Sequence, residues 1–178
     1  MSGSIITGIG SRSIKSPYTK WMADIAVYLA KEGCTLRSGG ASGSDTIFAE
    51  IFKHYDAPVE IFIPWDNFQG LRADGKTIIV ANHKLCTPYT EKYHPNHHNL
   101  SEGARKLINR NAHQVLGKDL NTPSDLVVCY TDRGNIQGGT AQAIKIAADI
   151  NIPVVNLGLY NDYELLFRDV CKALHKEN

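Results

Sequence analysis

The sequence predicts a doubly wound α/β fold: one domain with a mainly parallel sheet of about five strands and helices on both faces. Two observations support this. Short apolar, β-branched runs alternate with amphipathic segments of helical period along most of the chain, as expected for successive β–α units. Three of these runs lead directly into a glycine-rich turn and then a helix. The length of 178 residues suits a single domain over 1–178.

The first half of the chain predicts the order strand 4–9, helix 17–31, strand 34–36, helix 46–52 and strand 58–63. Pro17 is a favourable first-turn residue, and Trp21, Ile25 and Leu29 follow at the spacing of one helix face. Pro64 ends the third strand, because proline cannot donate a backbone hydrogen bond to a neighbouring strand.

Residues 65–99 interrupt the alternation and are predicted to be an insertion that forms one wall of a site, because this segment is long for a connection in a compact domain. Within it, 77–80 has the pattern of an extra strand and 85–93 that of a weak helix. The run YHPNHH contains three histidines, but no adjacent carboxylate or thiolate completes a ligand set. We therefore expect no metal site and no cofactor.

The second half predicts the order helix 101–116, strand 124–130, helix 140–150, strand 152–157 and helix 163–174. Ser101 is a typical N-cap, Glu102 suits the first helical turn, and Gly117 ends the helix. Leu166, Val170 and further apolar residues recur at helical spacing in the last helix.

The three glycine-rich turns predict a ligand site, because the carboxyl ends of parallel strands meet at one edge of a sheet. Glycines let the backbone approach a ligand, and serine hydroxyls beside free helix N–H groups suit phosphate. The other interpretation of the central turn is a tight turn whose helix is capped by Ser42 or Ser44. The candidate ligand-binding residues in the turns are Gly10, Ser11, Arg12, Ser38, Gly39, Gly40, Ser42, Gly43, Ser44, Gly138, Gly139, Thr140 and Gln142.

The helix at 101–116 adds three polar candidates, Arg110, Asn111 and Gln114. A guanidinium group matches phosphate or carboxylate, and amides can recognise a base or a ribose. The alternative is a solvated helix face. Asp45 is the candidate catalytic carboxylate because it begins a helix beside the central turn; its other interpretation is a first-turn residue favoured by the helix dipole.

The formal net charge is +1, without a long run of one sign, so a broad electropositive face is not predicted. The four cysteines lack the spacing of a zinc site. The N-terminal residues lack the pattern of a signal peptide, and no apolar run has the length of a membrane span. We expect a soluble cytoplasmic protein with no membrane partner.

The motifs GIGSR, LRSGGASGSD and IQGGTAQA together resemble the SLOG superfamily of Rossmann-like proteins, which includes the DNA-processing protein A (DprA/Smf) family and the cytokinin-activating phosphoribohydrolases. The run ARKLINRNAHQVLGKDLNTPSDLVVCYT, followed by GGTAQAIKIA, is similar to small DprA-like proteins of bacteriophages. This resemblance covers about 5–157. It implies a nucleotide-like ligand at the glycine turns, a substrate contact from Arg110, and a homodimer or higher homo-oligomer.

The phosphoribohydrolases that the chain resembles carry the signature GGxGTxxE, whose glutamate takes part in cleaving the N-glycosidic bond. The aligned run here is GGTAQAIK, with Ala141 at a glycine position and Lys145 at the glutamate position. A lysine cannot stabilise an oxocarbenium-like transition state or activate water as a carboxylate does. The resemblance therefore favours binding over cleavage.

We expect the protein to bind a nucleotide or a nucleotide-derived signal, ADP-ribose-like or cyclic, at the C-terminal edge of the sheet. If it is phage-encoded, it would act in the host cytoplasm as a counter-defence protein that sequesters the signal. One alternative is a nucleotide hydrolase that cleaves an N-glycosidic bond with Asp45. The other is a DprA-like recombination mediator that binds single-stranded DNA; its candidate basic residues are Arg12, Lys15, Arg37, Arg105 and Lys106.

Overall fold

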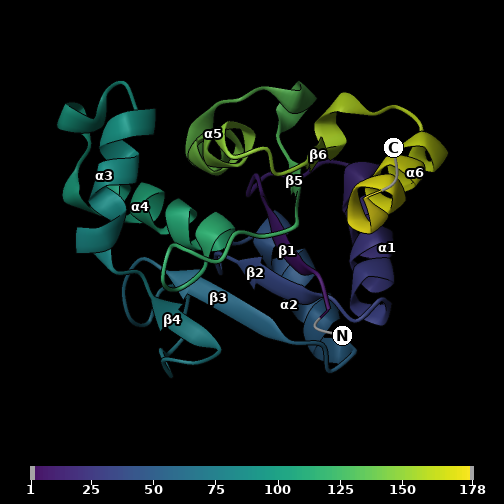
Figure 1. Cartoon of the computed structure of the whole chain (residues 1–178), viewed down its shortest axis with the longest axis horizontal. Helices are drawn as coiled ribbons and strands as arrows, with labels where there is room; N and C mark the ends of the chain where they lie inside the picture. Colours follow the sequence, from purple (N-terminus) through teal and green to yellow (C-terminus); the bar gives the residue numbers. More distant parts are fainter. Residues whose placement is uncertain (1–2, 177–178) are drawn as a thin grey trace.

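A computed structural model describes residues 3–176 of the chain. Within this range the strands form one sheet, in which all pairs are parallel and the strand order is β4-β3-β2-β1-β5-β6 (Figure 1). The strands are β1 (Ile5–Gly10), β2 (Thr35–Ser38), β3 (Val59–Ile63), β4 (Ile78–Val80), β5 (Leu126–Tyr130) and β6 (Val154–Asn156). The predicted α/β class is confirmed, and β4 adds a sixth strand to the five expected among the described residues.

Helices cover both faces of the sheet, as predicted. On one face α1, α2 and α6 enclose a core that includes Leu29, Phe48 and Val170. On the other face α3, α4 and α5 enclose a second core that includes Val115 and Ala143. The helices are α1 (Tyr18–Lys31), α2 (Ser44–His54), α3 (His83–Tyr93), α4 (Glu102–Leu116), α5 (Ala141–Asp149) and α6 (Tyr163–His175), with short 3-10 turns η1 (His97–Asn99), η2 (Asp132–Gly134), η3 (Gly138–Thr140) and η4 (Leu157–Leu159).

Strand β1 lies at the centre of the sheet, between β2 and β5. Ile6 pairs with Leu36 of β2 on one side and with Leu126 of β5 on the other. The chain builds the sheet outward from β1 through β2, β3 and β4, and later returns to the opposite side of β1 with β5. The strand order therefore reverses between β1 and β5, and in this class of sheet a crevice opens beyond the carboxyl ends of the strands at that point.

The segment 65–99 is integrated into the fold rather than looped out from it. Ile78 of β4 pairs with Ile61 of β3 at the edge of the sheet, and Cys86 of α3 is buried in the core shared with α4 and α5. Among residues 3–176, no group of three His, Cys, Asp or Glu side chains is placed to hold a metal ion. Over the same range, no helix combines the length and apolar character needed to cross a bilayer.

Helix α4 begins as the sequence predicts, because the Ser101 side chain accepts a hydrogen bond from the backbone N–H of Ala104 at 3.2 Å. Ser101→Ala removes this cap and is expected to lower the free energy of unfolding by about 1 kcal/mol. Urea unfolding followed by circular dichroism measures the change. The exposed Ser13→Ala is the control, expected to stay within about 0.5 kcal/mol of the parent protein; an equal loss in both variants would contradict the capping role.

Candidate functional site

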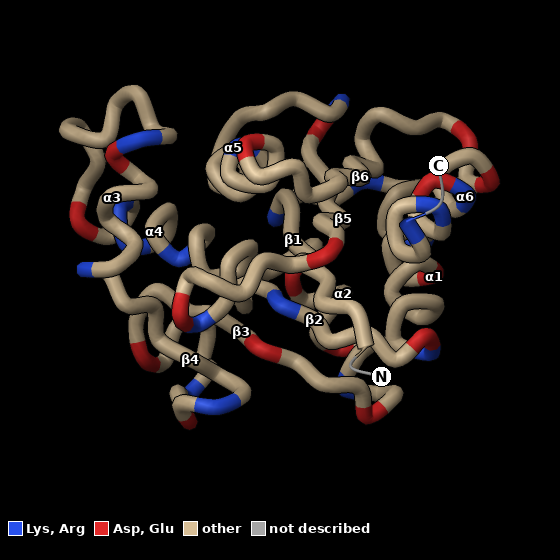
Figure 2. Tube along the Cα trace, viewed as in Figure 1, with Lys and Arg blue, Asp and Glu red and all other residues tan. Residues whose placement is uncertain are grey.

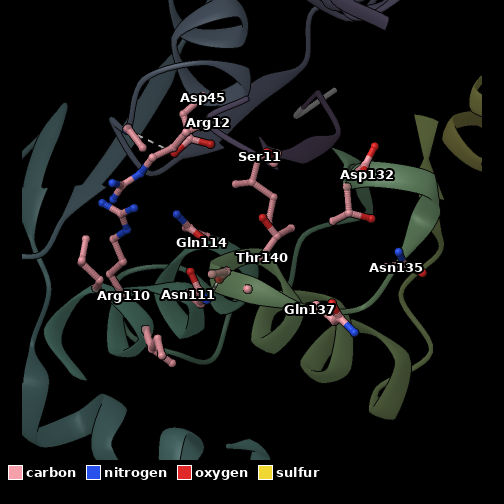
Figure 3. Close-up of a pocket in the computed structure, with 18 of the residues that line it drawn as sticks. Ser11, Arg12, Asp45, Arg110, Asn111, Gln114, Asp132, Asn135, Gln137 and Thr140 are labelled. Atoms are coloured by element: carbon pink, nitrogen blue, oxygen red, sulfur yellow. Dashed lines mark hydrogen bonds between the residues drawn. The ribbon is translucent and has the colours of Figure 1, made fainter. Parts of the chain in front are cut away.

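A cavity of about 700 Å³ lies at the carboxyl ends of β1 and β5, where the strand order reverses. The first and third glycine turns, α4 and the segment after β5 surround it (Figure 3). The sequence-predicted residues that line it are Gly10, Ser11, Arg12, Asp45, Arg110, Asn111, Gln114, Gly138, Gly139 and Thr140. The structure therefore brings together the two outer turns, the candidate carboxylate and the polar residues of α4.

The central turn supports the cavity more than it lines it. Ser38 donates its hydroxyl to the carbonyl oxygen of Gly8 at 2.6 Å, and Ser44 donates to the carbonyl oxygen of Ser11 at 2.8 Å. Gly43 packs so closely on the backbone of Arg12 that a Cβ atom there would collide with it. These contacts hold the first two glycine turns against each other.

The remaining residues of the central turn have other surroundings. Gly40 has a φ of 68° and packs against Leu71 and Ile61, and Ser42 is exposed. The alternative interpretation, in which Ser42 or Ser44 caps α2, is wrong, because Gly43 occupies the N-cap position without a side-chain hydrogen bond. Only Ala41 and Asp45 of this turn line the cavity.

Arg110 is the most unusual side chain of the site, because it is a guanidinium group that is only 6% exposed. Its Nη1 donates to the carbonyl oxygen of Gly39 at 2.6 Å, and its Cζ lies 5.0 Å from the centroid of the Phe68 ring. Its Nε is buried and has no hydrogen-bond partner among the described residues, and the same is true of Gln114 Oε1. A Cβ atom at position 39 would collide with Gln114 Nε2 and lie 2.8 Å from Asp45 Oδ2, so glycine is needed where these side chains meet the turn.

A second guanidinium group, that of Arg12, lies beside Arg110. In Figure 3 the two groups approach each other at one end of the cavity, below Asp45. Burial lowers the pKa of Arg110, the charge of Asp45 raises it, and the positive charge of Arg12 lowers it further. Two neighbouring guanidinium groups form a favourable place for an anion, since each can donate several hydrogen bonds to phosphate or carboxylate oxygens.

Asp45 is buried at the same end of the cavity and is 3% exposed. Burial raises its pKa to about 6, against the opposing effects of Arg110, of backbone N–H groups of Ala41 and Gly10, and of Arg12. The hydrogen bond from Ala41 N–H to Oδ2 measures 3.2 Å. The carboxyl group therefore titrates close to neutral pH, as catalytic acids and bases often do.

The third glycine turn is tied to α4 by Asn111, whose side-chain amide donates to the carbonyl oxygen of Gly139. Gln142, also a candidate, does not line the main cavity. Its Nε2 donates to Thr90 Oγ1 at 3.1 Å, and it faces a smaller neighbouring hollow. Helical periodicity could not show this, because the direction of Gln142 depends on how α5 packs against α3 and α4.

Several cavity residues were not among the sequence candidates. Leu107 and Ile108 of α4 form an apolar wall, and Thr131, Asn135 and Gln137 lie in the segment after β5. The sequence feature that indicates the last three is the polar run TDRGNIQ directly after β5, because loops at the carboxyl ends of parallel strands commonly carry binding residues.

The basic residues considered for DNA binding differ in their surroundings. Arg37 is buried and bonds Glu60 Oε1 at 3.1 Å, so it is not available to a nucleic acid. Three others have partners within the protein: Lys15 pairs with Asp132, Arg105 donates to the carbonyl oxygen of His97, and Lys106 pairs with Glu102. Figure 2 shows basic and acidic positions interspersed along the trace. Arg12 and Arg110 are thus the cations that reach the cavity among the described residues.

A comparison of folds identifies a similar solved structure, that of DNA processing protein A from Helicobacter pylori, described as having a unique single-stranded DNA binding mode. The two chains superpose with a TM-score of 0.56 at 15% sequence identity, over 96% of this chain and 81% of the other. No protein-family model matches the chain, and no curated protein sequence matches it. The likeness shows a shared fold, with this chain spanning most of its neighbour's length.

Proposed function

We propose that this protein binds single-stranded DNA and holds one nucleotide unit of the strand in the cavity between β1 and β5. The observation that carries the proposal is the pair of guanidinium groups, Arg12 and Arg110, at one end of a cavity in a chain of nearly neutral charge. The phosphate of the nucleotide would lie between them. The apolar wall of Leu107 and Ile108 would contact the sugar or the base.

The environment of Arg110 supports an anionic ligand. A buried guanidinium group without its full set of partners costs free energy, and Nε of Arg110 lacks a partner. A phosphate at the cavity would supply both the opposite charge and hydrogen-bond acceptors. Charge-assisted hydrogen bonds of this kind are about twice as strong as neutral ones.

The fold likeness to a protein described as binding single-stranded DNA supports a strand as the source of this phosphate. The two cations of the cavity also determine how binding should respond to salt. With one phosphate held between them, the slope of log affinity against log salt would be about −0.7, so affinity would fall about 2.6-fold between about 50 and 200 mM salt.

Fluorescence anisotropy with a labelled oligo(dT) strand tests this proposal. Arg12→Gln is expected to weaken binding about tenfold and to make the salt slope shallower, because one of the two cations at the phosphate is lost. Lys53→Gln is the matched control, because Lys53 is an exposed cation in the last turn of α2 and does not line the cavity. Absence of binding at low salt would contradict the proposal. A salt slope several units steeper than expected would mean that the strand binds to other cations of the protein.

The second candidate function is binding of a free nucleotide or nucleotide derivative, ADP-ribose-like or cyclic. The cavity volume favours it, since about 700 Å³ lies within the range of about 300–1,000 Å³ typical of small-molecule sites. In this case the protein would sequester a nucleotide signal, as a phage counter-defence protein would, and a homo-oligomer would be its natural form. The two candidates share the site and differ in whether the ligand continues beyond it.

Incubation with mononucleotides, ADP-ribose isomers and cyclic dinucleotides, followed by mass spectrometry of the molecules released by heat, separates these candidates. Recovery of one intact compound supports the second candidate. Release of free base would instead show a hydrolase, for which Asp45 is the carboxylate inside the cavity with a pKa of about 6. Asp45→Asn would then abolish release while leaving the compound bound.

A further inference from the structure

A second hollow of about 240 Å³ adjoins the main cavity. It lies between residues 93–96, which end α3 and continue beyond it, and the first turns of α5. Ile108, Gln137 and Gly138 line both spaces, so the two are separated only by a shared rim. In Figure 3 Gln137 is drawn far from Arg110, with Thr140 between them. The rim therefore lies away from the guanidinium end of the cavity.

Lys145 supplies the positive charge of the second hollow. Its Nζ donates to the carbonyl oxygen of Tyr93 at 3.3 Å, a long hydrogen bond that leaves the other two ammonium protons for a ligand. Among residues 3–176, no carboxylate lies within ion-pair distance of this ammonium group. The ammonium charge is therefore not neutralised by the described part of the chain.

Gln142 and His94 add unmet hydrogen-bonding capacity beside Lys145. Gln142 is 3% exposed, and its Oε1 has no partner among the described residues. The ring Nδ1 of His94 is likewise buried and unpartnered. Native structures satisfy nearly all buried polar groups, so these two atoms, both on residues that line the hollow, point to a polar ligand there.

We propose that this second hollow binds the neighbouring nucleotide of the same strand, with its phosphate at Lys145. The inference rests on the proposed function, because it needs a ligand that continues past the first nucleotide. A volume of about 240 Å³ is below the range of complete small-molecule sites, and so suits one part of a longer ligand. The strand would cross the rim formed by Ile108, Gln137 and Gly138.

Calorimetric titration with thymidine 5′-monophosphate and with the 5′-phosphorylated dinucleotide pTpT tests the second site. The parent protein is expected to bind pTpT about tenfold more tightly than the mononucleotide. Lys145→Gln should remove this gain and leave mononucleotide affinity unchanged. Lys145→Arg should retain the gain, and Lys84→Gln, which changes an exposed lysine near the start of α3, should leave both affinities unaltered.

The outcomes separate the two proposals. If the mononucleotide binds but pTpT binds no better, or if the gain survives in Lys145→Gln, the second site is excluded while the first stands. A loss of stability in Lys145→Gln with the gain intact would show that Lys145 only supports the end of α3. If neither the mononucleotide, pTpT nor a longer oligo(dT) binds, the proposed function itself fails and the second site fails with it.

Discussion

Replacing Arg110 by lysine is expected to weaken binding of thymidine 5′-monophosphate or oligo(dT) by about 10- to 100-fold, the loss of one to two strong charge-assisted hydrogen bonds. Lysine keeps the positive charge but lacks the planar fork with which Arg110 bonds Gly39 and offers further N–H donors to an anion. It also loses the stacking of the guanidinium on Phe68. Calorimetric titration measures the affinity, and thermal unfolding shows that the variant is folded.

Arg105→Lys is the matched control for this change. Arg105 lies on the same helix but bonds the carbonyl oxygen of His97 and does not line the cavity. The same substitution there should leave affinity within about twofold, as for most surface changes. An Arg110→Lys protein that binds as tightly as the parent would show that only the positive charge at this position matters for binding, or that the ligand occupies another site.

Replacing Asp45 by asparagine is expected to raise the free energy of unfolding by about 3 kcal/mol at about pH 8. An aspartate has a pKa of about 3.9 in an unfolded chain, whereas folding raises the pKa of Asp45 to about 6, chiefly by burial. Below about pH 4 the carboxyl group is protonated in both states. Between about pH 4 and 6 the unfolded chain loses its proton first, so stability falls as pH rises, and above about pH 6 this loss is complete.

Urea unfolding of the parent and Asp45→Asn proteins at several pH values measures this effect. The two stabilities should converge as pH falls toward about 4, because asparagine mimics the protonated carboxyl group. Asp132→Asn is the control, since Asp132 lines the same cavity but is exposed, and little change is expected. A less stable Asp45→Asn protein at high pH would mean that attraction between the carboxylate and the guanidinium groups outweighs the cost of its burial.

A gain in stability on loss of Asp45 would also bear on function. Active sites commonly hold buried charges that reduce stability, and removing them stabilises the fold at the expense of activity. If Asp45→Asn is more stable but binds the mononucleotide less well, the carboxylate contributes to the ligand site. If it binds more tightly, the carboxylate mainly opposes the phosphate charge beside Arg12 and Arg110.

The sequence predicted the alternation of strands and helices well because these elements depend on local signals. The apolar period places the buried face of α1, where Ile25 and Leu29 are fully buried as expected, and Ser101 begins α4. Strand β4 was less evident, since it has only three residues and its place in the sheet depends on pairing with β3. Its local pattern alone could not establish that partner.

The sequence by itself determined the fold class and the sheet edge at which the first and third glycine turns meet, because strand, turn and helix are specified within a few neighbouring residues. Only the tertiary structure decided which candidate side chains share a cavity. Packing of α4 against the central turn buries Arg110 beside Gly39 and Asp45, while packing of α5 turns Gln142 toward Thr90 and the second hollow. Both placements arise from contacts between segments far apart in the chain, which helical spacing cannot encode.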